Sequence, residues 1–398
     1  MKRHRNSFQK INTILFDSDG VITTEREYWL AAELTILELL YGEQWIGLND
    51  NGLRVILYKP GAPVILGKLV NRDFSESLKI RGINSNWDLT YFSCALYLIE
   101  IFKLIHDKNK LTDLLTSGFA EETFKKIGDA LTKRTIEITS LDKITEDFFQ
   151  ASDRLKLEST EEGKNYTDKR FLTAALNERL KIQCGIEMPV FSGNDDLWHI
   201  CQTLFQEWYL GDNLLERLQK KKLSKISKAG LIEYEMPIIP TGRIMEIFSM
   251  LKEANIIIGI ATGRPYEELI TPLKRWGLLN FFDLSRIATH REVQRAELLL
   301  KGSGNSKSLS KPNPYIYLKA LFPDKRPEEI LEMRLPLENG DTVLVVGDSA
   351  SDILAAKQMG AQSAVVLSEV KNPDTVAGLK GLEPDYVLKD VNGLKELF

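Results

Sequence analysis

The stretch INTILFDSDGV, residues 11–21, decides the fold, because a short apolar run ends in it at two carboxylates and a glycine. Residues 11–16 are rich in Ile, Leu and Phe and are followed by a turn signal, which predicts a strand buried on both faces of a sheet. The side chains that follow such a strand reach the carboxyl edge of a parallel sheet, where open α/β folds bind ligands. Asp17 and Asp19, two residues apart on extended backbone, would point the same way.

Two neighbouring carboxylates repel each other, so that one is protonated or a cation lies between them. Ser18 is too small to crowd such a site, and Gly20 allows the chain to turn away at once. A strand that ends in a solvated Asp-Ser-Asp-Gly turn explains the same residues, and on this stretch alone it is the better explanation. The rest of the chain has to decide between the two interpretations.

Length and composition indicate a globular protein with more than one domain. The chain has 398 residues, of which 43% are hydrophobic and 27% charged, and its formal net charge is -4. The length predicts two or three domains, and the charge gives no reason to expect nucleic acid or an anionic membrane as a partner. The most apolar stretch, residues 89–105, contains Glu100 and Lys103 and predicts a buried helix rather than a membrane span.

We expect a cytoplasmic location and reduced cysteines. The basic residues at positions 2–5 are not followed by the apolar core of a secretory signal. The three cysteines lie far apart without a CxxC pair, which favours apolar packing over a disulfide or a zinc site: Cys94, Cys184 and Cys201.

Residues 23–235 are largely helical in pattern. Helices are expected at 24–41, 89–105, 121–133 and 196–210, a short strand-like run at 54–58, and an exposed loop at 159–169. His199, beside the apolar stripe of the last helix, has no second ligand nearby and is interpreted as a packed or surface residue. Five lysines that follow predict a solvated helix face, with an anion-attracting rim as the alternative: Lys220, Lys221, Lys222, Lys225 and Lys228.

From residue 236 onward, strand and helix patterns alternate. Strands are expected at 256–261, 342–346 and 363–367, and helices at 241–254, 265–276, 314–321 and 351–359. Such alternation predicts right-handed βαβ units and a parallel sheet, which the strand at 11–16 must join because the helical half offers it no partner. The predicted fold class is therefore α/β. Residues 1–22 and 236–398 form a Rossmann-like core, interrupted after its first strand by a large, mostly α-helical domain over residues 23–235.

Reactive residue types follow the other predicted strands. Thr262-Gly263-Arg264 comes after the strand at 256–261, where a hydroxyl and free backbone N–H groups can hold a phosphate, although the same turn is common without function. Arg264 is a candidate anion contact. Lys311 stands before Pro312-Asn313-Pro314, and the fixed backbone favours a lysine aimed at acidic strand ends over a solvated one.

The last motif is Gly347-Asp348-Ser349-Ala350-Ser351-Asp352, which follows the strand at 342–346. It puts Asp348 at a strand end and Asp352 one helical turn later. With Asp17 and Asp19 these residues predict an oxygen-rich acidic cluster that suits a hard cation. Magnesium, bridging to a substrate phosphate, is the expected occupant.

Together, the Asp17–Val21 segment, Thr262-Gly263, Lys311-Pro312 and the Gly347–Asp352 segment resemble the four motifs of the haloacid dehalogenase (HAD) superfamily, in the order in which that family carries them. The resemblance covers residues up to about 22 and from about 236 to the end. It implies that residues 23–235 are a C1-type cap domain, larger than the usual helical cap.

The resemblance also implies a function, a magnesium-dependent phosphatase acting on a small phosphorylated metabolite. Asp17 would attack phosphorus and form an aspartyl phosphate, and Asp19 would act as general acid and then general base. Mg²⁺ would be held by Asp17, the backbone carbonyl of Asp19 and Asp348, with Asp352 as a further ligand or beside the ligands. The groups expected to bind the phosphoryl oxygens are Thr262, the Gly263 amide and Lys311. Dehalogenases of the family lack the second aspartate, so Asp19 points to phosphate substrates.

Two other functions stay open at this point. A phosphosugar mutase of the β-phosphoglucomutase kind would share every core residue and differ in what the cap presents to the intermediate. A non-catalytic protein that binds a phosphorylated metabolite could keep the same fold, although it would not need the set Asp17, Asp19, Lys311 and Asp348. The sequence names neither the substrate nor an oligomeric state.

Overall fold

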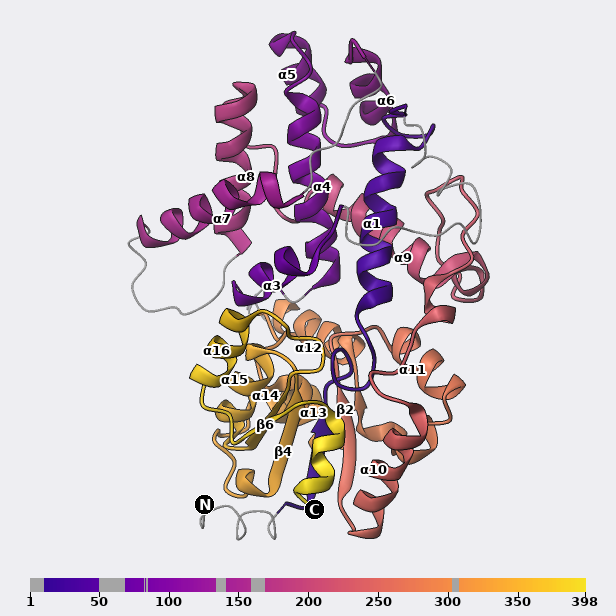
Figure 1. Cartoon of the computed structure of the whole chain (residues 1–398), viewed down its shortest axis with the longest axis vertical. Coiled ribbons are helices and arrows are strands. Elements are labelled where there is room, and N and C mark those ends of the chain that lie inside the picture. Colours follow the sequence, from indigo (N-terminus) through magenta and orange to yellow (C-terminus); the bar gives the residue numbers. More distant parts are fainter. Residues whose placement is uncertain are drawn as a thin grey trace. The chain divides into compact units, whose positions relative to one another are not determined.

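The computed structural model describes residues 11–49, 69–81, 83, 85–133, 141–158, 169–302 and 308–398. The chain divides into two compact units, one formed by Met1–Glu25 with Ile232–Phe398 and the other by Arg26–Leu231. The sequence predicted that the core would comprise residues 1–22 and 236–398. In the structure its first segment ends at Glu25, three residues later, and its second begins at Ile232, four residues earlier. The second unit is thus an insertion in the first, directly after its first strand (Figure 1).

The first unit is built on a six-stranded sheet in the order β3-β2-β1-β4-β5-β6, and every neighbouring pair is parallel. The strands are β1 Thr13–Phe16, β2 Ile257–Ala261, β3 Ile287–Ala288, β4 Val343–Gly347, β5 Gln362–Val366 and β6 Tyr386–Leu388. The predicted α/β, Rossmann-like fold class is therefore confirmed. The sequence did not indicate β3 and β6, because strands of two and three residues are too short to show a periodic pattern.

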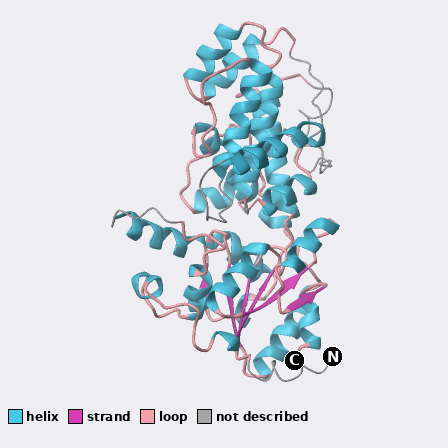
Figure 2. Cartoon of the chain, turned by 90° about the vertical axis from the view of Figure 1, so that its left-hand side faces the viewer, coloured by secondary structure: helices cyan, strands magenta, loops and turns pink. Residues whose placement is uncertain are grey.

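Helices cover both faces of this sheet (Figure 2). On β1, Ile14 and Phe16 join one apolar core and Leu15 joins the other, as alternation along a strand requires. The first core includes residues of α10 (Thr241–Glu253) and α11 (Tyr266–Arg275), and the second includes residues of α12 (His290–Gly302), α13 (Tyr315–Leu321) and α15 (Ala350–Met359). Because both faces are covered, the central strands are mostly apolar, and polar groups follow at their carboxyl ends.

Shorter helices complete the first unit. They are α14 Pro327–Leu331, α16 Pro373–Gly381 and the 3₁₀ helices η2 Leu231–Tyr234, η3 Leu279–Phe281, η4 Leu284–Arg286, η5 Gly340–Thr342 and η6 Val391–Glu396. The predicted end of the helix at 351–359 is confirmed, since α15 is followed by Gly360 at φ = 71°.

The described elements of the second unit are helices. They are α1 Arg26–Tyr41, α3 Arg72–Ile80, α4 Asn86–Phe102, α5 Lys108–Thr116, α6 Glu121–Ala130, α7 Leu141–Glu158, α8 Lys169–Cys184 and α9 Asp196–Arg217. Helix α4 is buried along most of its length and packs against α1, α8 and α9, which confirms the buried helix predicted for residues 89–105. The strand-like run at 54–58, most of the loop at 159–169 and residues 303–307 lie outside the described residues.

Several smaller predictions about the second unit can be compared with the structure. The three cysteines are free and buried, as predicted. His199 is exposed on α9. The lysine-rich segment is not a helix, since α9 ends at Arg217, and Lys228 is buried rather than solvated. Among the helices that the structure describes, none combines the length and the apolar character needed to cross a bilayer.

Candidate active site

The candidate site lies where β1, β2 and β4 end. In the sheet Phe16 is aligned with Ile260 on one side and with Val346 on the other. Asp17 follows β1, Thr262 follows β2 and Asp348 follows β4, so three neighbouring strands deliver their next polar residues to one edge. This is the carboxyl edge of a parallel sheet, which is where the sequence predicted that Asp17 would lie.

Three buried carboxylates meet at this edge. Asp17, Asp348 and Asp352 each offer one oxygen, and these oxygens all lie within 4.8 Å of one another. The turn after β1 makes room for them, because Gly20 adopts φ = 69° and a Cβ atom there would lie 2.4 Å from Asp348 Oδ2. A residue with a side chain could therefore take this position only by displacing the carboxylate.

Lys311 connects two of these carboxylates. Its Nζ atom lies 2.9 Å from Asp17 Oδ1 and 2.9 Å from Asp352 Oδ1, and its side chain is 7% exposed. Burial alone would lower the pKa of Lys311, but Asp17 and Asp352 raise it above its ordinary value, so the ammonium keeps its proton. The lysine that precedes α13 is thus directed at the acidic strand ends.

The cluster brings several like charges together. Three carboxylates lie close to one another in a buried space, and the Lys311 ammonium contacts two of them. Burial raises the pKa of Asp17 to about 7, although Lys311 lowers it in part. Burial would also raise the pKa of Asp352, but Lys311 and hydrogen bonds from Ser349 and Tyr317 hold it below its ordinary value. A divalent cation between the carboxylates would remove the remaining repulsion, so the donor set fits Mg²⁺.

Thr262 and Gly263 form the turn after β2. Thr262 is fully buried, its backbone N–H donates to the Ala288 carbonyl over 3.0 Å, and its Oγ1 accepts a 3.2 Å hydrogen bond from the Arg264 N–H. Gly263 is exposed, and among the described residues no heavy atom lies within 4 Å of the position that a Cβ atom would take. The backbone at Gly263 is therefore open to approach by a small anionic group.

Arg264 is not directed at open space. Its Nε atom donates a 2.7 Å hydrogen bond to Asp19 Oδ1, and Nη2 contacts the same oxygen. Nη2 also donates to Thr23 Oγ1 over 2.7 Å, and Nη1 lies 2.6 Å from Glu235 Oε1. The residue is 3% exposed. The arginine that the sequence suggested as a substrate contact is thus paired with two carboxylates of the protein itself.

Two residues to which the sequence assigned no role also belong to this edge. The Tyr317 hydroxyl donates a 2.7 Å hydrogen bond to Asp352 Oδ1, and its ring centroid lies 4.8 Å from Lys311 Nζ. Ser349 donates to Asp352 Oδ2 from its backbone N–H over 3.1 Å and from its hydroxyl over 2.7 Å. Ser349 could have been found as the residue before α15, because serine at that position commonly caps a helix. Tyr317 carries no such local signal.

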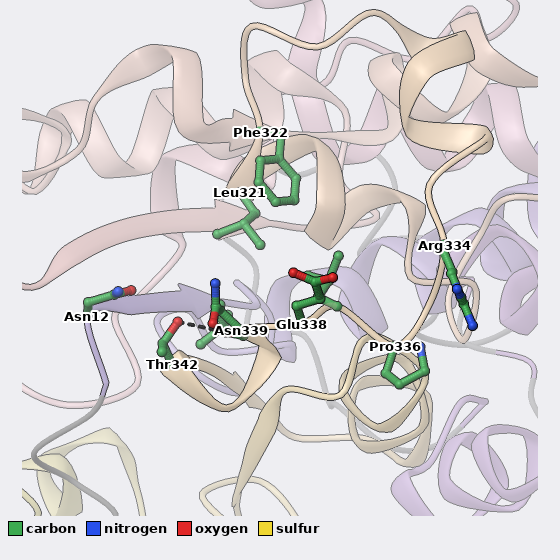
Figure 3. A pocket seen from close by; sticks show the side chains of 10 residues that line it. Asn12, Leu321, Phe322, Arg334, Pro336, Glu338, Asn339 and Thr342 are labelled. Carbon is green, nitrogen blue, oxygen red and sulfur yellow. Dashed lines mark hydrogen bonds between the residues drawn. The ribbon is translucent and has the colours of Figure 1, made fainter.

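A separate cavity of about 780 Å³ lies at the opposite edge of the sheet (Figure 3). Its lining includes Asn12, which directly precedes β1, Thr342, which directly precedes β4, and Val343, the first residue of β4. It is therefore on the amino side of strands whose carboxyl ends carry the carboxylates, and it is distinct from the candidate site.

One family model and one curated relative match parts of this chain. The model of the family described as HAD-hydrolase-like matches residues 308–394, which include Lys311, Asp348 and Asp352. A pyrophosphatase PpaX from Halalkalibacterium halodurans is 27% identical over 158 residues. That match covers 40% of this chain and 59% of the relative, so the chain matches little more than half the length of this curated protein.

One solved structure resembles this chain over nearly its whole length. A crystal structure from the Northeast Structural Genomics Consortium has a TM-score of 0.72 and 27% identity, and the match covers 97% of this chain and 98% of that one. A haloacid dehalogenase-like family hydrolase from Streptococcus pneumoniae matches 98% of both chains at a TM-score of 0.40 and 12% identity. A protein described as a predicted phosphoglycolate phosphatase from Haemophilus somnus matches 98% of both chains at a TM-score of 0.38 and 12% identity. The last two likenesses are too distant to carry an argument about function.

Proposed function

Because the chain belongs to the haloacid dehalogenase (HAD) superfamily of hydrolases, we propose that it is a magnesium-dependent phosphatase that hydrolyses a small phosphomonoester through an aspartyl phosphate on Asp17. One observation carries the proposal. The buried Asp17 carboxylate lies 2.9 Å from the Lys311 ammonium, in a cluster with Asp348 and Asp352. A nucleophile, a fixed cation and a set of oxygen ligands at one strand end are the parts that phosphoryl transfer needs.

In the first step an Asp17 oxygen attacks phosphorus. The bond between phosphorus and the ester oxygen breaks, and the leaving oxygen takes the bond's electron pair and a proton from the Asp19 carboxyl group. The products of this step are the alcohol and an aspartyl phosphate on Asp17. Lys311 keeps the attacking carboxylate directed and supplies positive charge beside the phosphoryl oxygens.

In the second step Asp19, now a carboxylate, takes a proton from a water molecule. The water oxygen attacks phosphorus and the bond from phosphorus to Asp17 breaks. This restores the Asp17 carboxylate and releases inorganic phosphate. The Thr262 hydroxyl and the Gly263 amide are assigned to the phosphoryl oxygens, a role supported by the open backbone at Gly263.

Mg²⁺ is assigned to Asp17, Asp348 and the backbone carbonyl of Asp19, with Asp352 as a further ligand or beside the ligands. When bound, the ion would offset the negative charge that the carboxylates and the substrate phosphate bring together. We also assign the inserted helical unit, Arg26–Leu231, as a C1-type cap, on the basis of its place in the chain after the first strand.

The test is a phosphate-release assay on the full-length protein. Wild type and Asp17→Asn are compared on an aryl phosphate with Mg²⁺ and with a chelator, and wild type is then screened on phosphorylated sugars, nucleotides and organic acids. Pyrophosphate is included because the curated relative is named a pyrophosphatase. We expect Mg²⁺-dependent release that falls by at least about a thousandfold in Asp17→Asn, since a lost nucleophile removes the covalent route. Equal turnover by both proteins would refute the nucleophile, and phosphate returned to the organic product would indicate a mutase.

A further inference from the structure

Asp19 is held in place by a side chain far from it in sequence. Its Oδ1 atom accepts hydrogen bonds from Nε and Nη2 of Arg264, 245 residues later in the chain. Thr23 donates a 3.2 Å hydrogen bond to the same carboxylate oxygen from Oγ1, which itself accepts from Arg264. The Asp19 side chain is 21% exposed, whereas the arginine side chain is 1% exposed. The carboxylate therefore keeps an open side, while the group that fixes it is enclosed.

Arg264 is anchored from its other end. Its Nη1 atom lies 2.6 Å from Glu235 Oε1, and both side chains are 1% exposed. Nη1 also lies 3.4 Å from the Glu268 carbonyl oxygen, at the start of α11. A guanidinium group offers five donors in one plane, so it can grip two carboxylates at once without turning. Glu235 thus fixes the arginine, and the arginine fixes Asp19.

Thr23 and Glu235, which both contact Arg264, belong to the two segments that connect the units. Thr23 lies just before the chain enters the helical insertion, and Glu235 lies just after it returns. These segments also pair with each other, since the Thr24 N–H donates to the Met236 carbonyl over 3.1 Å and the Ile238 N–H donates to the Ile22 carbonyl over 2.8 Å. Arg264 therefore ties the Asp19 side chain to both connecting segments.

We propose that Arg264 is a positioning residue, which holds Asp19 at the leaving-group oxygen and is itself held by Glu235, rather than a contact to the substrate phosphate. The inference rests on the proposed function, because it assigns Asp19 as the acid of the first step. An arginine whose donors already face two carboxylates and a hydroxyl of the protein has little capacity left for a substrate anion. Its effect on the reaction would therefore pass through the aspartate.

The leaving group distinguishes the two roles. A dinitrophenolate departs without a proton, whereas a phenolate or an alkoxide needs one, so only poor leaving groups depend on a well-placed acid. The ratio of kcat/KM for 2,4-dinitrophenyl phosphate to that for phenyl phosphate measures this dependence, and it reports the first step alone. In Arg264→Ala we expect kcat/KM to fall about 10- to 100-fold more with phenyl phosphate than with the dinitrophenyl ester. Asp19→Asn should show the same selectivity.

Inorganic phosphate tests the competing role directly. If Arg264 only positions Asp19, the inhibition constant of phosphate should change less than about twofold in Arg264→Ala, because no contact to the anion is lost. Equal losses of kcat/KM with both esters, or phosphate inhibition weakened tenfold or more, would overturn the proposal. Either result would indicate that Arg264 contacts the substrate phosphate.

If Arg264→Ala does not fold, two milder variants test the same proposal. Arg264→Lys keeps the positive charge but cannot donate from two nitrogens to one oxygen, and Glu235→Gln loosens the far anchor, so both should show a smaller selective loss. Arg275→Ala is the matched control, since Arg275 donates to the Ile232 and Glu235 carbonyls over 2.8 and 2.7 Å, on the same connecting segment. It should show no leaving-group selectivity, and selectivity as large as that of Arg264→Ala would contradict the proposal. Wild type without turnover of either ester would refute the proposed function, and this inference with it.

Discussion

The Tyr317 hydroxyl donates a 2.7 Å hydrogen bond to Asp352 Oδ1, the oxygen that also lies 2.9 Å from the Lys311 ammonium. The tyrosine ring lies against the same ammonium, with 4.8 Å between Nζ and the ring centroid. One side chain from α13 therefore fixes both a cluster carboxylate and the cation beside it. Its hydroxyl and its ring make separate contacts, so their effects can be separated by substitution.

Tyr317→Phe keeps the ring and removes the donor. We expect the free energy of unfolding to fall by about 1.5–3 kcal/mol, because a buried carboxylate loses a charge-assisted hydrogen bond. We also expect the Mg²⁺ concentration for half-maximal activity to rise roughly tenfold, since groups that orient metal ligands typically matter to that extent. Urea unfolding and a magnesium titration of aryl phosphate turnover measure the two effects.

Tyr315→Phe is the matched control on the same helix. Tyr315 is 2% exposed, and within the part of the chain that the structure describes its hydroxyl has no hydrogen-bond partner. Loss of this hydroxyl should leave the magnesium requirement unchanged and should not lower the free energy of unfolding, because no hydrogen bond is lost with it. If the two tyrosine variants shifted the magnesium requirement equally, the orienting role of Tyr317 would be wrong.

Gly20→Ala should remove activity while leaving the protein folded. Its Cβ atom would lie 2.4 Å from Asp348 Oδ2, so the carboxylate must move, and the backbone at φ = 69° adds about 1–2 kcal/mol of strain. We expect turnover to fall at least about a hundredfold, because small displacements of ligands or reacting groups are costly. Phosphate release and thermal unfolding are measured on the same sample.

Gly277→Ala separates the strain from the effect on the site. Gly277 has nearly the same backbone angle, φ = 72°, but within the described part of the chain its Cβ atom would meet only the end of the Met245 side chain, at 3.2 Å. Both variants should carry about the same backbone strain, and Gly277→Ala should retain turnover. Activity in Gly20→Ala close to that of Gly277→Ala would show that Asp348 tolerates displacement.

Local patterns in the sequence were sufficient to predict the strand ends. The apolar run at 11–16 contains β1, Thr13–Phe16, and the predicted helix at 351–359 matches α15, Ala350–Met359, because periodicity and the glycine stop are properties of neighbouring residues. Since parallel strands share one carboxyl edge, the residues that follow β1, β2 and β4 could also be expected to meet.

Partner choice could not be predicted in the same way. Arg264 follows a strand end that suits a phosphate, and the sequence alone favours an anion from outside. The structure instead pairs it with Asp19 and with Glu235, 29 positions before it in the chain. Lys228 was similarly grouped with neighbouring lysines, although its partners are distant glutamates. Long-range pairs depend on how elements pack, which neither composition nor spacing encodes.

Magnesium should stabilise the protein in a pH-dependent way. Burial raises the pKa of Asp17 to about 7, so below pH 7 the ion must displace a proton from this carboxyl group, and above pH 7 it does not. We therefore expect the apparent Kd for Mg²⁺ to be nearly constant above pH 7 and to weaken about tenfold for each pH unit below it. Thermal unfolding at several magnesium concentrations, at pH 6 and pH 8, measures this without reference to activity.

Asp348→Asn tests whether that stabilisation comes from the cluster. The variant removes one of the three carboxylates that lie within 4.8 Å of one another. The rise in Tm on adding Mg²⁺ should disappear, and the metal-free variant should be at least as stable as the metal-free wild type, because one repulsive charge is gone. An unchanged magnesium-induced shift would place the ion elsewhere.

Lys228 should be a main contributor to the stability of the helical unit. Its ammonium lies 2.8 Å from Glu38 Oε2 and 2.8 Å from Glu207 Oε2, and all three side chains are at most 1% exposed. Lys228→Met would leave two buried carboxylates without their cation, which we expect to lower the free energy of unfolding by about 3–5 kcal/mol.

Lys222→Met is the control for this prediction. Lys222 pairs with Asp212 over 2.8 Å, but both side chains are about one-third exposed, and such pairs contribute less than about 1 kcal/mol. Urea unfolding followed by tryptophan fluorescence measures both losses, and Trp208, whose ring centroid lies 4.7 Å from the Lys228 ammonium, is one of the six tryptophans that contribute to the signal. Similar losses in the two variants would mean that burial of the Lys228 ion pairs has no special weight in this unit.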